Sequence, residues 1–259
     1  VRLLTSDLIQ ATTLEALVDR VLGSAAATPP RWPATEVTMR EGTSGRTVYC
    51  VAGGGASALA FSPLAANLDP TDPVIVFQGR GVERRAPAEW TFAGMVRRRV
   101  RRIDPPADGP IVLVGHSFGA VLALDIARSL RARGHDVVPF LIDPFFARTR
   151  AAADLPPMGM GRRKKLLLPF TGLIPAAQER VLGLTLEQAN ILMRRHHPQP
   201  FPGPAYGYRT SDNEDGAALW EQLLPDGIVR DLPASHMSIL QKPIIDAIVA
   251  DNQQDLDTQ

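Results

Sequence analysis

Short apolar runs rich in β-branched residues recur along the chain from residue 47 onward. Several of these runs are continuous rather than alternating, which is typical of strands buried on both faces of a parallel sheet. Segments with helical periodicity separate them, and these are long enough to cross over a sheet and return parallel. The pattern therefore predicts an α/β fold with a mostly parallel central sheet and helices on both faces. We expect strands at 47–52, 74–77, 111–115, 137–142 and 228–232, a possible strand at 205–209, and helices at 63–68, 90–103 and 120–132.

The two ends of the alternating region have different patterns. Residues 1–23 predict a short amphipathic helix, because apolar residues recur there at the spacing of one helix face. Residues 24–46 open with a proline-rich, aperiodic stretch, and we expect a linker and a domain boundary there. The main domain would then span 47–259. Within it, residues 147–204 are rich in Leu, Pro, Arg and Lys without a clear strand, which predicts a helical insertion.

Composition narrows the functional classes. The 259 residues are 45% hydrophobic, which is enough for a large core and excludes a disordered chain. Twenty-eight basic residues against 27 acidic ones give a formal net charge of +1, so no global field favours nucleic acid or a membrane surface. The single cysteine, Cys50, cannot close an internal disulfide, and we interpret it as a core residue in a reducing compartment. No signal peptide is visible, so we expect a cytoplasmic protein, and the initial Val suggests a piece of a longer polypeptide.

A serine motif follows the strand predicted at 111–115. Residues 115–119 read Gly-His-Ser-Phe-Gly, and an Ala- and Leu-rich helix begins directly after them. In such a G-x-S-x-G nucleophile elbow a tight strand-to-helix turn exposes the serine hydroxyl, and glycines flank it because a Cβ would collide with neighbouring backbone. The turn also places Ser117 at a helix N-terminus, where backbone N–H groups favour developing negative charge. We therefore predict that Ser117 is a nucleophile.

A serine nucleophile needs a histidine base, and the chain contains five histidines. His236 is the candidate, because it follows the strand at 228–232, precedes a helix and gives the chain order serine, acid, histidine found in α/β-hydrolases. We interpret His116, next to the serine, as a packing residue whose side chain points away from it. The remaining histidines are a turn residue and a pair in the insertion, namely His135, His196 and His197.

The histidine in turn needs a carboxylate, and the chain offers two positions for it. Asp143 ends a predicted apolar strand, so it would stand at the same carboxyl-terminal edge of the sheet as Ser117. Asp212, or Asp215, after the possible later strand is the rival, since a later strand end is the commoner position of the acid in such hydrolases. The residues alone leave both positions open.

Two backbone N–H groups are also needed to hold a developing oxyanion. One would come from the residue after the nucleophile, Phe118, and the other from the loop after an earlier strand. Gly53, Gly54 and Gly55 follow the strand predicted at 47–52, and we choose the Gly54 amide as the second donor. This loop lacks the Lys-Ser/Thr of a P-loop and the G-x-G-x-x-G spacing of a dinucleotide site, so phosphate binding is not favoured. We expect no metal and no cofactor bound by the domain itself.

Four segments in this order resemble the type I thioesterase domains that end polyketide synthases and nonribosomal peptide synthetases. They are VAGGGAS with FSPLAANL, GHSFGA, LIDPFF and PASHMSIL, and the resemblance extends over residues 47–250. It implies an α/β-hydrolase fold in which the insertion at 147–204 forms a lid. It also implies that the acid is Asp143, and it supports the histidine and the two amides chosen above. Ala120 departs from the family, which often has a third glycine there.

The resemblance also implies a reaction. The acyl chain would arrive as a thioester on the phosphopantetheine of an acyl or peptidyl carrier domain, pass to Ser117, and leave by hydrolysis or cyclisation. Residues 1–23 resemble the last helix of such a carrier, which would place the carrier immediately upstream.

Two other functions stay open at this point. One is a stand-alone editing thioesterase, or a carboxylesterase, with the same triad, and the other is a non-catalytic acyl-binding or docking module that keeps the fold. The basic runs within 97–102 and 162–165 are expected to be solvated surfaces, or else to steer an acidic carrier.

Overall fold

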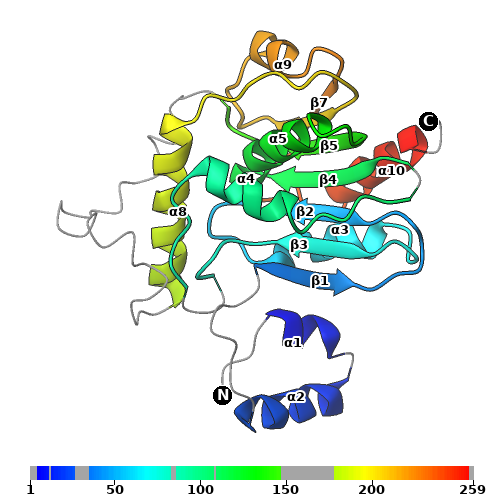
Figure 1. The fold of residues 1–259 in the computed structure, drawn as a ribbon, viewed down its shortest axis with the longest axis vertical. Coiled ribbons are helices and arrows are strands. Elements are labelled where there is room, and N and C mark those ends of the chain that lie inside the picture. The colour runs from blue at the N-terminus through cyan, green and yellow to red at the C-terminus, as the bar shows by residue number, and fades with distance from the viewer. Residues whose placement is uncertain are drawn as a thin grey trace, which may run out of the picture.

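The structure is a computed structural model that describes residues 5–11, 13–26, 35–82, 86–107, 109–146 and 178–256. Within these residues a seven-stranded sheet crosses the molecule in the order β1-β3-β2-β4-β5-β6-β7 (Figure 1). β1 is antiparallel to β3, and every other neighbouring pair is parallel, which confirms the mostly parallel sheet. The strands are β1 Glu36–Arg40, β2 Val48–Val51, β3 Val74–Phe77, β4 Ile111–His116, β5 Val137–Ile142, β6 Tyr206–Thr210 and β7 Ile228–Leu232.

Helices cover both faces of the sheet, as predicted (Figure 1). One apolar cluster joins α4, α5, α8 and α9 to the strands, and a second joins α3 and α10 to them. Successive residues of β4, such as Leu113 and Val114, belong to different clusters, because side chains alternate between the two faces of a strand. The helices are α1 Thr5–Gln10, α2 Leu14–Ala26, α3 Ser62–Asn67, α4 Phe92–Val100, α5 Phe118–Arg131, α8 Gln178–Arg195, α9 Ala217–Leu223 and α10 Ile244–Leu256, with a 3-10 turn, η1, at Ala58–Phe61.

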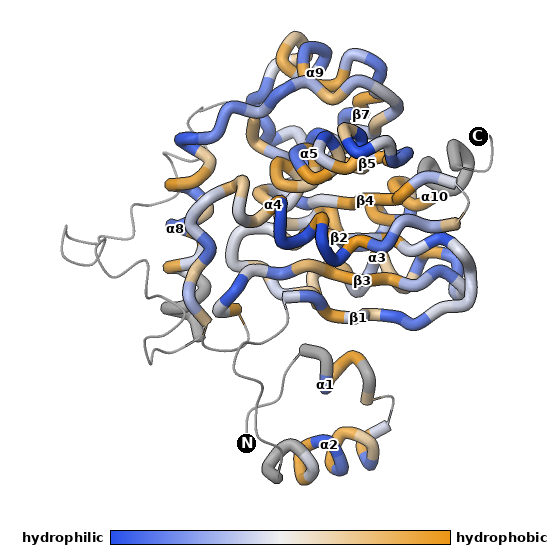
Figure 2. The backbone as a smooth tube through the Cα atoms, in the orientation of Figure 1, coloured by the Kyte–Doolittle hydropathy of each residue, from blue (hydrophilic) through white to orange (hydrophobic). Residues whose placement is uncertain are grey.

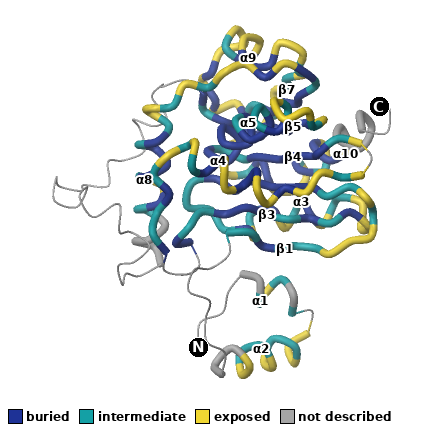
Figure 3. Tube along the Cα trace, in the orientation of Figure 1, coloured by how far each residue is buried: buried dark blue, intermediate teal, exposed yellow. Residues whose placement is uncertain are grey.

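The middle of the sheet is buried (Figure 3), and apolar residues recur along these strands (Figure 2). α5 follows β4 directly and packs between the sheet and α4. It is buried along most of its length, through residues such as Leu122, Leu124 and Ile126. Since each buried Leu or Ile contributes about 1.5–3 kcal/mol, the core holds the strand–helix unit that contains the serine motif firmly in place. No helix in the described ranges combines the length and the apolar character needed to cross a membrane.

The sheet begins inside the segment predicted as a linker. β1 alternates polar residues with Val37 and Met39, and of these only Val37 is buried. The strand pairs with β3 at the edge of the sheet, and the guanidinium of Arg40 donates hydrogen bonds to four backbone carbonyl oxygens in and after α3. A short, largely polar edge strand has little local signal, because pairing and remote contacts hold it. The linker prediction is therefore wrong for residues 36–40.

Two helices precede the sheet where one was predicted. α1 lies against β1, and Ile9 of α1 and Met39 of β1 both pack against the second apolar cluster. α2 begins after Thr13, whose hydroxyl accepts a hydrogen bond from the Ala16 N–H at 3.1 Å, and it continues three residues beyond the predicted end at residue 23.

The described part of the insertion predicted at 147–204 contains α8. This helix crosses the edge of the sheet where the parallel strands end (Figure 1). Ala189 and Leu192 on α8 join the apolar cluster of α4 and α5, so the helix is anchored to the main domain. Residues 147–177, with the basic run at 162–165, lie outside the described residues.

Candidate active site

Ser117 stands between β4 and α5 in a sharp backbone turn. Its backbone angles are φ 56° and ψ −127°, a conformation that a serine rarely adopts. A Cβ on Gly115 would lie 2.5 Å from the Cα of Ala120, and a Cβ on Gly119 would lie 2.1 Å from the backbone oxygen of Val51. Both glycines of the motif are therefore required by the close approach of backbone on either side of the turn.

The structure brings together the three residues predicted as nucleophile, base and acid. Nε2 of His236 lies 3.0 Å from Oγ of Ser117, and Nδ1 of the same ring lies 2.6 Å from Oδ2 of Asp143. The three side chains follow β4, β7 and β5 respectively, and the ends of these strands meet at one edge of the sheet. With its Nδ1 proton donated to Asp143, the imidazole presents Nε2 as the atom that can accept the serine proton.

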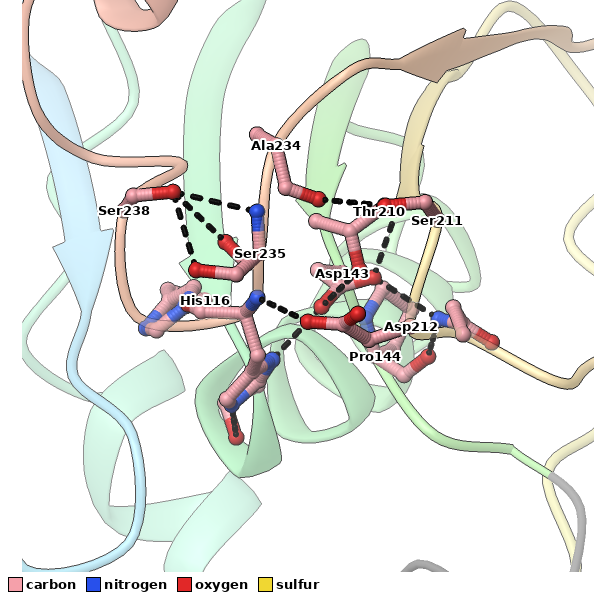
Figure 4. A network of polar contacts seen from close by, with 12 residues as sticks. His116, Asp143, Pro144, Thr210, Ser211, Asp212, Ala234, Ser235 and Ser238 are labelled. Atoms are coloured by element: carbon pink, nitrogen blue, oxygen red, sulfur yellow. Dashed lines mark hydrogen bonds and ion pairs between the residues drawn. The ribbon is translucent and has the colours of Figure 1, made fainter.

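Asp143 is fully buried, and residues at the end of β6 and just after it hold its carboxylate (Figure 4). Thr210 donates to it twice, from its N–H and from its hydroxyl, both at 3.0 Å, and the Asn213 amide donates at 2.9 Å. Burial acts to raise the pKa of this carboxyl, but the hydrogen bonds from His236, Thr210 and Asn213 outweigh burial and lower the pKa below its ordinary value. The carboxylate is therefore ionised throughout the neutral range.

Sequence reasoning did not identify Thr210 and Asn213 as supporting residues. Thr210 ends the strand that was predicted only as possible at 205–209, and that strand, β6, pairs with β5 beside Asp143. A hydroxyl at the end of the neighbouring parallel strand and an amide three residues later are the signal that could have identified these two residues.

The rival acids occupy other positions. The carboxylate of Asp212 accepts a hydrogen bond from the backbone N–H of His236 at 3.3 Å, so it contacts the loop and not the ring. Asp215 is buried and accepts a hydrogen bond from the Phe146 N–H at 2.5 Å. Of the aspartates weighed from the sequence, Asp143 is the one that faces the imidazole.

Short hydrogen-bonded turns secure the loop that carries His236 (Figure 4). The Ser235 N–H donates to the Ser238 hydroxyl at 3.0 Å, and the Ser211 hydroxyl donates to the Ala234 carbonyl at 3.1 Å. These contacts tie the loop both to itself and to the segment after β6.

The sequence predicts that the His116 side chain points away from Ser117. In the structure this side chain contacts the candidate base. Its ring stacks on that of His236 with centroids 4.9 Å apart, and the Phe145 ring lies 4.9 Å from His236 as well. His116 Nε2 lies 3.3 Å from the His236 carbonyl oxygen, and since that oxygen only accepts, Nε2 is the donor. Burial, with the neighbouring His236 second, lowers the pKa of His116 to about 4. His116 is thus a neutral packing residue, but it packs against the candidate base.

The glycine loop after β2 lies next to the serine. A Cβ on Gly53 would be 3.3 Å from the Cβ of Ser117, and a Cβ on Gly54 would be 3.8 Å from that of Phe118 and 2.7 Å from that of Ala189 on α8. The loop is therefore enclosed between the elbow and α8. A pocket opens beside it, with Phe118 in its wall.

The basic run on α4 is only partly a solvated surface. Arg99 is buried and pairs with the buried carboxylate of Glu89 at 3.2 Å, and Arg98 binds the same carboxylate at 3.0 Å. Glu89 and Arg99 line the pocket beside the glycine loop. Helical periodicity does not reveal this pair, because Glu89 precedes the helix.

Comparison with known proteins finds a family similarity over the part of the chain that contains Ser117 and Asp143. Residues 46–151 match the sequence profile of the thioesterase domain family. A nonribosomal peptide synthetase of Aspergillus terreus is 27% identical over 125 residues, which are 46% of this chain and 13% of that protein. The chain spans between 4% and 13% of the length of the curated relatives that it matches.

Solved structures share the fold. A four-domain nonribosomal peptide synthetase bound to AMP and glycine matches with a TM-score of 0.69 at 20% identity, over 98% of this chain and 22% of that one. A type II thioesterase from the yersiniabactin pathway matches with a TM-score of 0.63 at 16% identity, over 87% of this chain and 99% of that one. The fold is that of the α/β-hydrolases. The matched region, residues 46–151, is similar to the thioesterase domain family, and the relatives and solved structures that the chain matches include nonribosomal peptide synthetases.

Proposed function

We propose that this domain is a serine thioesterase that takes an acyl chain from a phosphopantetheine carrier onto Ser117 and then releases it. The observation that carries the proposal is the hydrogen-bonded row from Ser117 through His236 to the buried Asp143. This is the arrangement that activates a serine hydroxyl at neutral pH. The family match supports a thioester as the substrate class.

In the first half of the reaction, Nε2 of His236 takes the proton from Ser117 as Oγ attacks the thioester carbonyl. The negative charge that develops on the carbonyl oxygen is held by the backbone N–H groups of Phe118 and Gly54. The C–S bond then breaks, the imidazolium protonates the departing pantetheine thiolate to the thiol, and the acyl chain remains as an ester on the serine. Asp143 stays ionised and stabilises the imidazolium.

In the second half, His236 removes a proton from the releasing nucleophile, which attacks the acyl-enzyme ester. Water yields a free acid, and a hydroxyl or amine of the chain itself yields a ring. The serine leaves with the proton returned from the imidazolium. We propose that α8 forms one wall of the space for the acyl chain, since Ala189 lies against the glycine loop.

We further propose that the carrier stands upstream in the same polypeptide, as in type I domains. The curated relatives are several times longer than this chain, and residues 1–23 resemble the last helix of a carrier. Leu14, Val18 and Leu22 follow one another at a spacing of four along α2 and are exposed, so a neighbouring domain would cover an apolar stripe. The alternative is a stand-alone type II enzyme, and the experiments below separate the two.

The first test uses a fluorophosphonate probe and a thioester substrate. Wild type should be labelled on one serine, and Ser117→Ala should abolish labelling and lower turnover by on the order of 10⁴ to 10⁶. Ser129→Ala, at the far end of α5, is the matched control and should behave as wild type. If wild type is not labelled, the domain is an acyl-binding module and the proposal fails.

The second test compares how the substrate is presented. We expect an acyl chain on a fused upstream carrier to be released faster than the same chain on a separate carrier, because the fusion raises the effective concentration. Equal rates would favour a stand-alone enzyme. Faster hydrolysis of oxygen esters than of matched thioesters would favour a carboxylesterase.

A further inference from the structure

The pocket beside the glycine loop contains more positive than negative charge. Arg80 and Arg99 line it together with a single acidic residue, Glu89. The carboxylate of Glu89 already binds two guanidinium groups, those of Arg98 and Arg99. Glu89 therefore forms ion pairs with Arg98 and Arg99, whereas Arg80 lines the same pocket without an ion pair to it among the described residues.

Arg80 is the cation that this cluster leaves unpaired. Among the described residues its guanidinium has no hydrogen-bond or ion-pair partner, although the residue is half-buried. Burial lowers the pKa of Arg80 and repulsion from Arg98 lowers it further, while the charge of Glu89 acts in the opposite direction, and the guanidinium remains charged at neutral pH. The Nε of Arg99 is also buried without a hydrogen-bond partner. A half-buried cation with a like-charged neighbour is stabilised when an anion enters beside it.

The place of the pocket limits which anion can reach it. Its wall includes Phe118, the residue after Ser117, so a group bound there lies close to the reacting carbonyl. In a carrier-bound substrate the phosphate stands at the opposite end of the pantetheine arm from the thioester sulfur. A carboxylate on the acyl chain, a few bonds from the carbonyl, fits this position better.

We propose that this pocket binds a carboxylate of the acyl chain, with Arg80 as the residue that pairs with it. The inference rests on the proposed function and names its substrate class, an acyl chain that bears an acid group in addition to the thioester. The planar guanidinium can hold a carboxylate through two hydrogen bonds. Gln188 of α8 donates a hydrogen bond to the Glu89 backbone oxygen, so this helix closes the pocket on its other side.

The test uses two matched series of N-acetylcysteamine thioesters, whose chains end in a carboxylate or in the neutral carboxamide. These substrates contain no phosphate. Wild type should show a higher kcat/KM for the best carboxylate chain than for its carboxamide. Arg80→Gln should lower kcat/KM for that carboxylate chain by about 10- to 100-fold, as expected for a lost hydrogen-bonded charge pair, and should leave the carboxamide unchanged.

Arg97→Gln is the matched control, since it removes the same charge from an exposed position on α4. It should leave both series unchanged. Equal losses on both series in Arg80→Gln, or no preference in wild type, would overturn the inference while leaving the thioesterase intact. Neutral acyl chains on phosphopantetheine and on pantetheine give a further comparison. If Arg80→Gln lowers kcat/KM only for the phosphopantetheine thioesters, the pocket binds the carrier phosphate instead. No turnover of either series by wild type would overturn the proposed function as well.

Discussion

Four hydrogen bonds converge on the carboxylate of Asp143, from Thr210, Asn213 and His236. The backbone of Asp143 also has a φ of 46°, which is uncommon for any residue but glycine. A carboxylate held in this way cannot rotate out of contact with the imidazole. At the scale of single residues, the site thus depends on an acid whose orientation is determined by side chains from the neighbouring strand.

Replacing Asp143 tests whether that acid orients the base. Asp143→Asn keeps the shape but removes the charge that stabilises the imidazolium, so we expect kcat/KM to fall by about 10⁴. Asp212→Asn should cost less than about tenfold, because Asp212 contacts only the backbone N–H of His236. Steady-state kinetics of both variants with the same thioester substrate measure these two losses of kcat/KM. If Asp143→Asn leaves kcat/KM nearly unchanged and Asp212→Asn lowers it strongly, the acid is Asp212.

The lowered pKa of His116 predicts that the stability of the folded protein depends on pH. Its pKa is about 4 in the folded protein against an ordinary value of 6.5, so the folded state resists protonation that the unfolded state accepts. The stability that depends on its neutral form is present above the unfolded pKa and is lost as the pH falls from about 6.5 towards 4. Between pH 7 and pH 5 the loss should be about 2 kcal/mol.

Urea unfolding at the two pH values measures this loss in wild type and in His116→Asn. The variant cannot take up a proton there, so its free energy of unfolding should fall by less over the same interval. The charged groups that influence His116 are His236 and Asp143, and both remain in the variant. An unchanged pH dependence would assign the acid sensitivity to other groups.

At the scale of elements, the decisive unit is β4, the turn and α5. β2 lies beside β4, and its backbone approaches the first turn of α5 so closely that only glycine fits at position 119. The strand, the turn and the helix are therefore positioned by one another, and the exposed serine is a consequence of their packing.

Gly119→Ala should damage this unit. The added Cβ would meet the Val51 backbone oxygen, which cannot move without disturbing the sheet, so we expect a loss of about 3 kcal/mol or more in the free energy of unfolding. Gly216→Ala, before α9, is the control, since a Cβ there has open space. Thermal or urea unfolding compares the two. Equal stability of both variants would contradict the close approach seen at the elbow.

At the scale of the whole molecule, the predictions from sequence hold where the signal is local. β2, β3, β4, β5 and β7 appear within a residue or two of their predicted bounds. The first four are short runs of mainly apolar residues, many of them β-branched, and β7 begins with Ile228 and Val229. The helix predicted at 90–103 forms only over Phe92–Val100, starting after the Thr91 cap. α9 was not predicted, since its seven residues are too few for a clear helical period.

The sequence by itself determined the parallel sheet, the glycine-flanked turn and the serine at its tip, because these features are specified by residues that are neighbours in the chain. Only the tertiary structure decided that β1 joins the sheet, that Thr210 and Asn213 hold the carboxylate of Asp143, that His116 stacks on His236, and that Arg99 is buried against Glu89. The physical reason is the same in each case. Edge pairing, side-chain orientation and the burial of a charge depend on contacts with distant segments, and no local pattern of hydrophobic and polar residues records them.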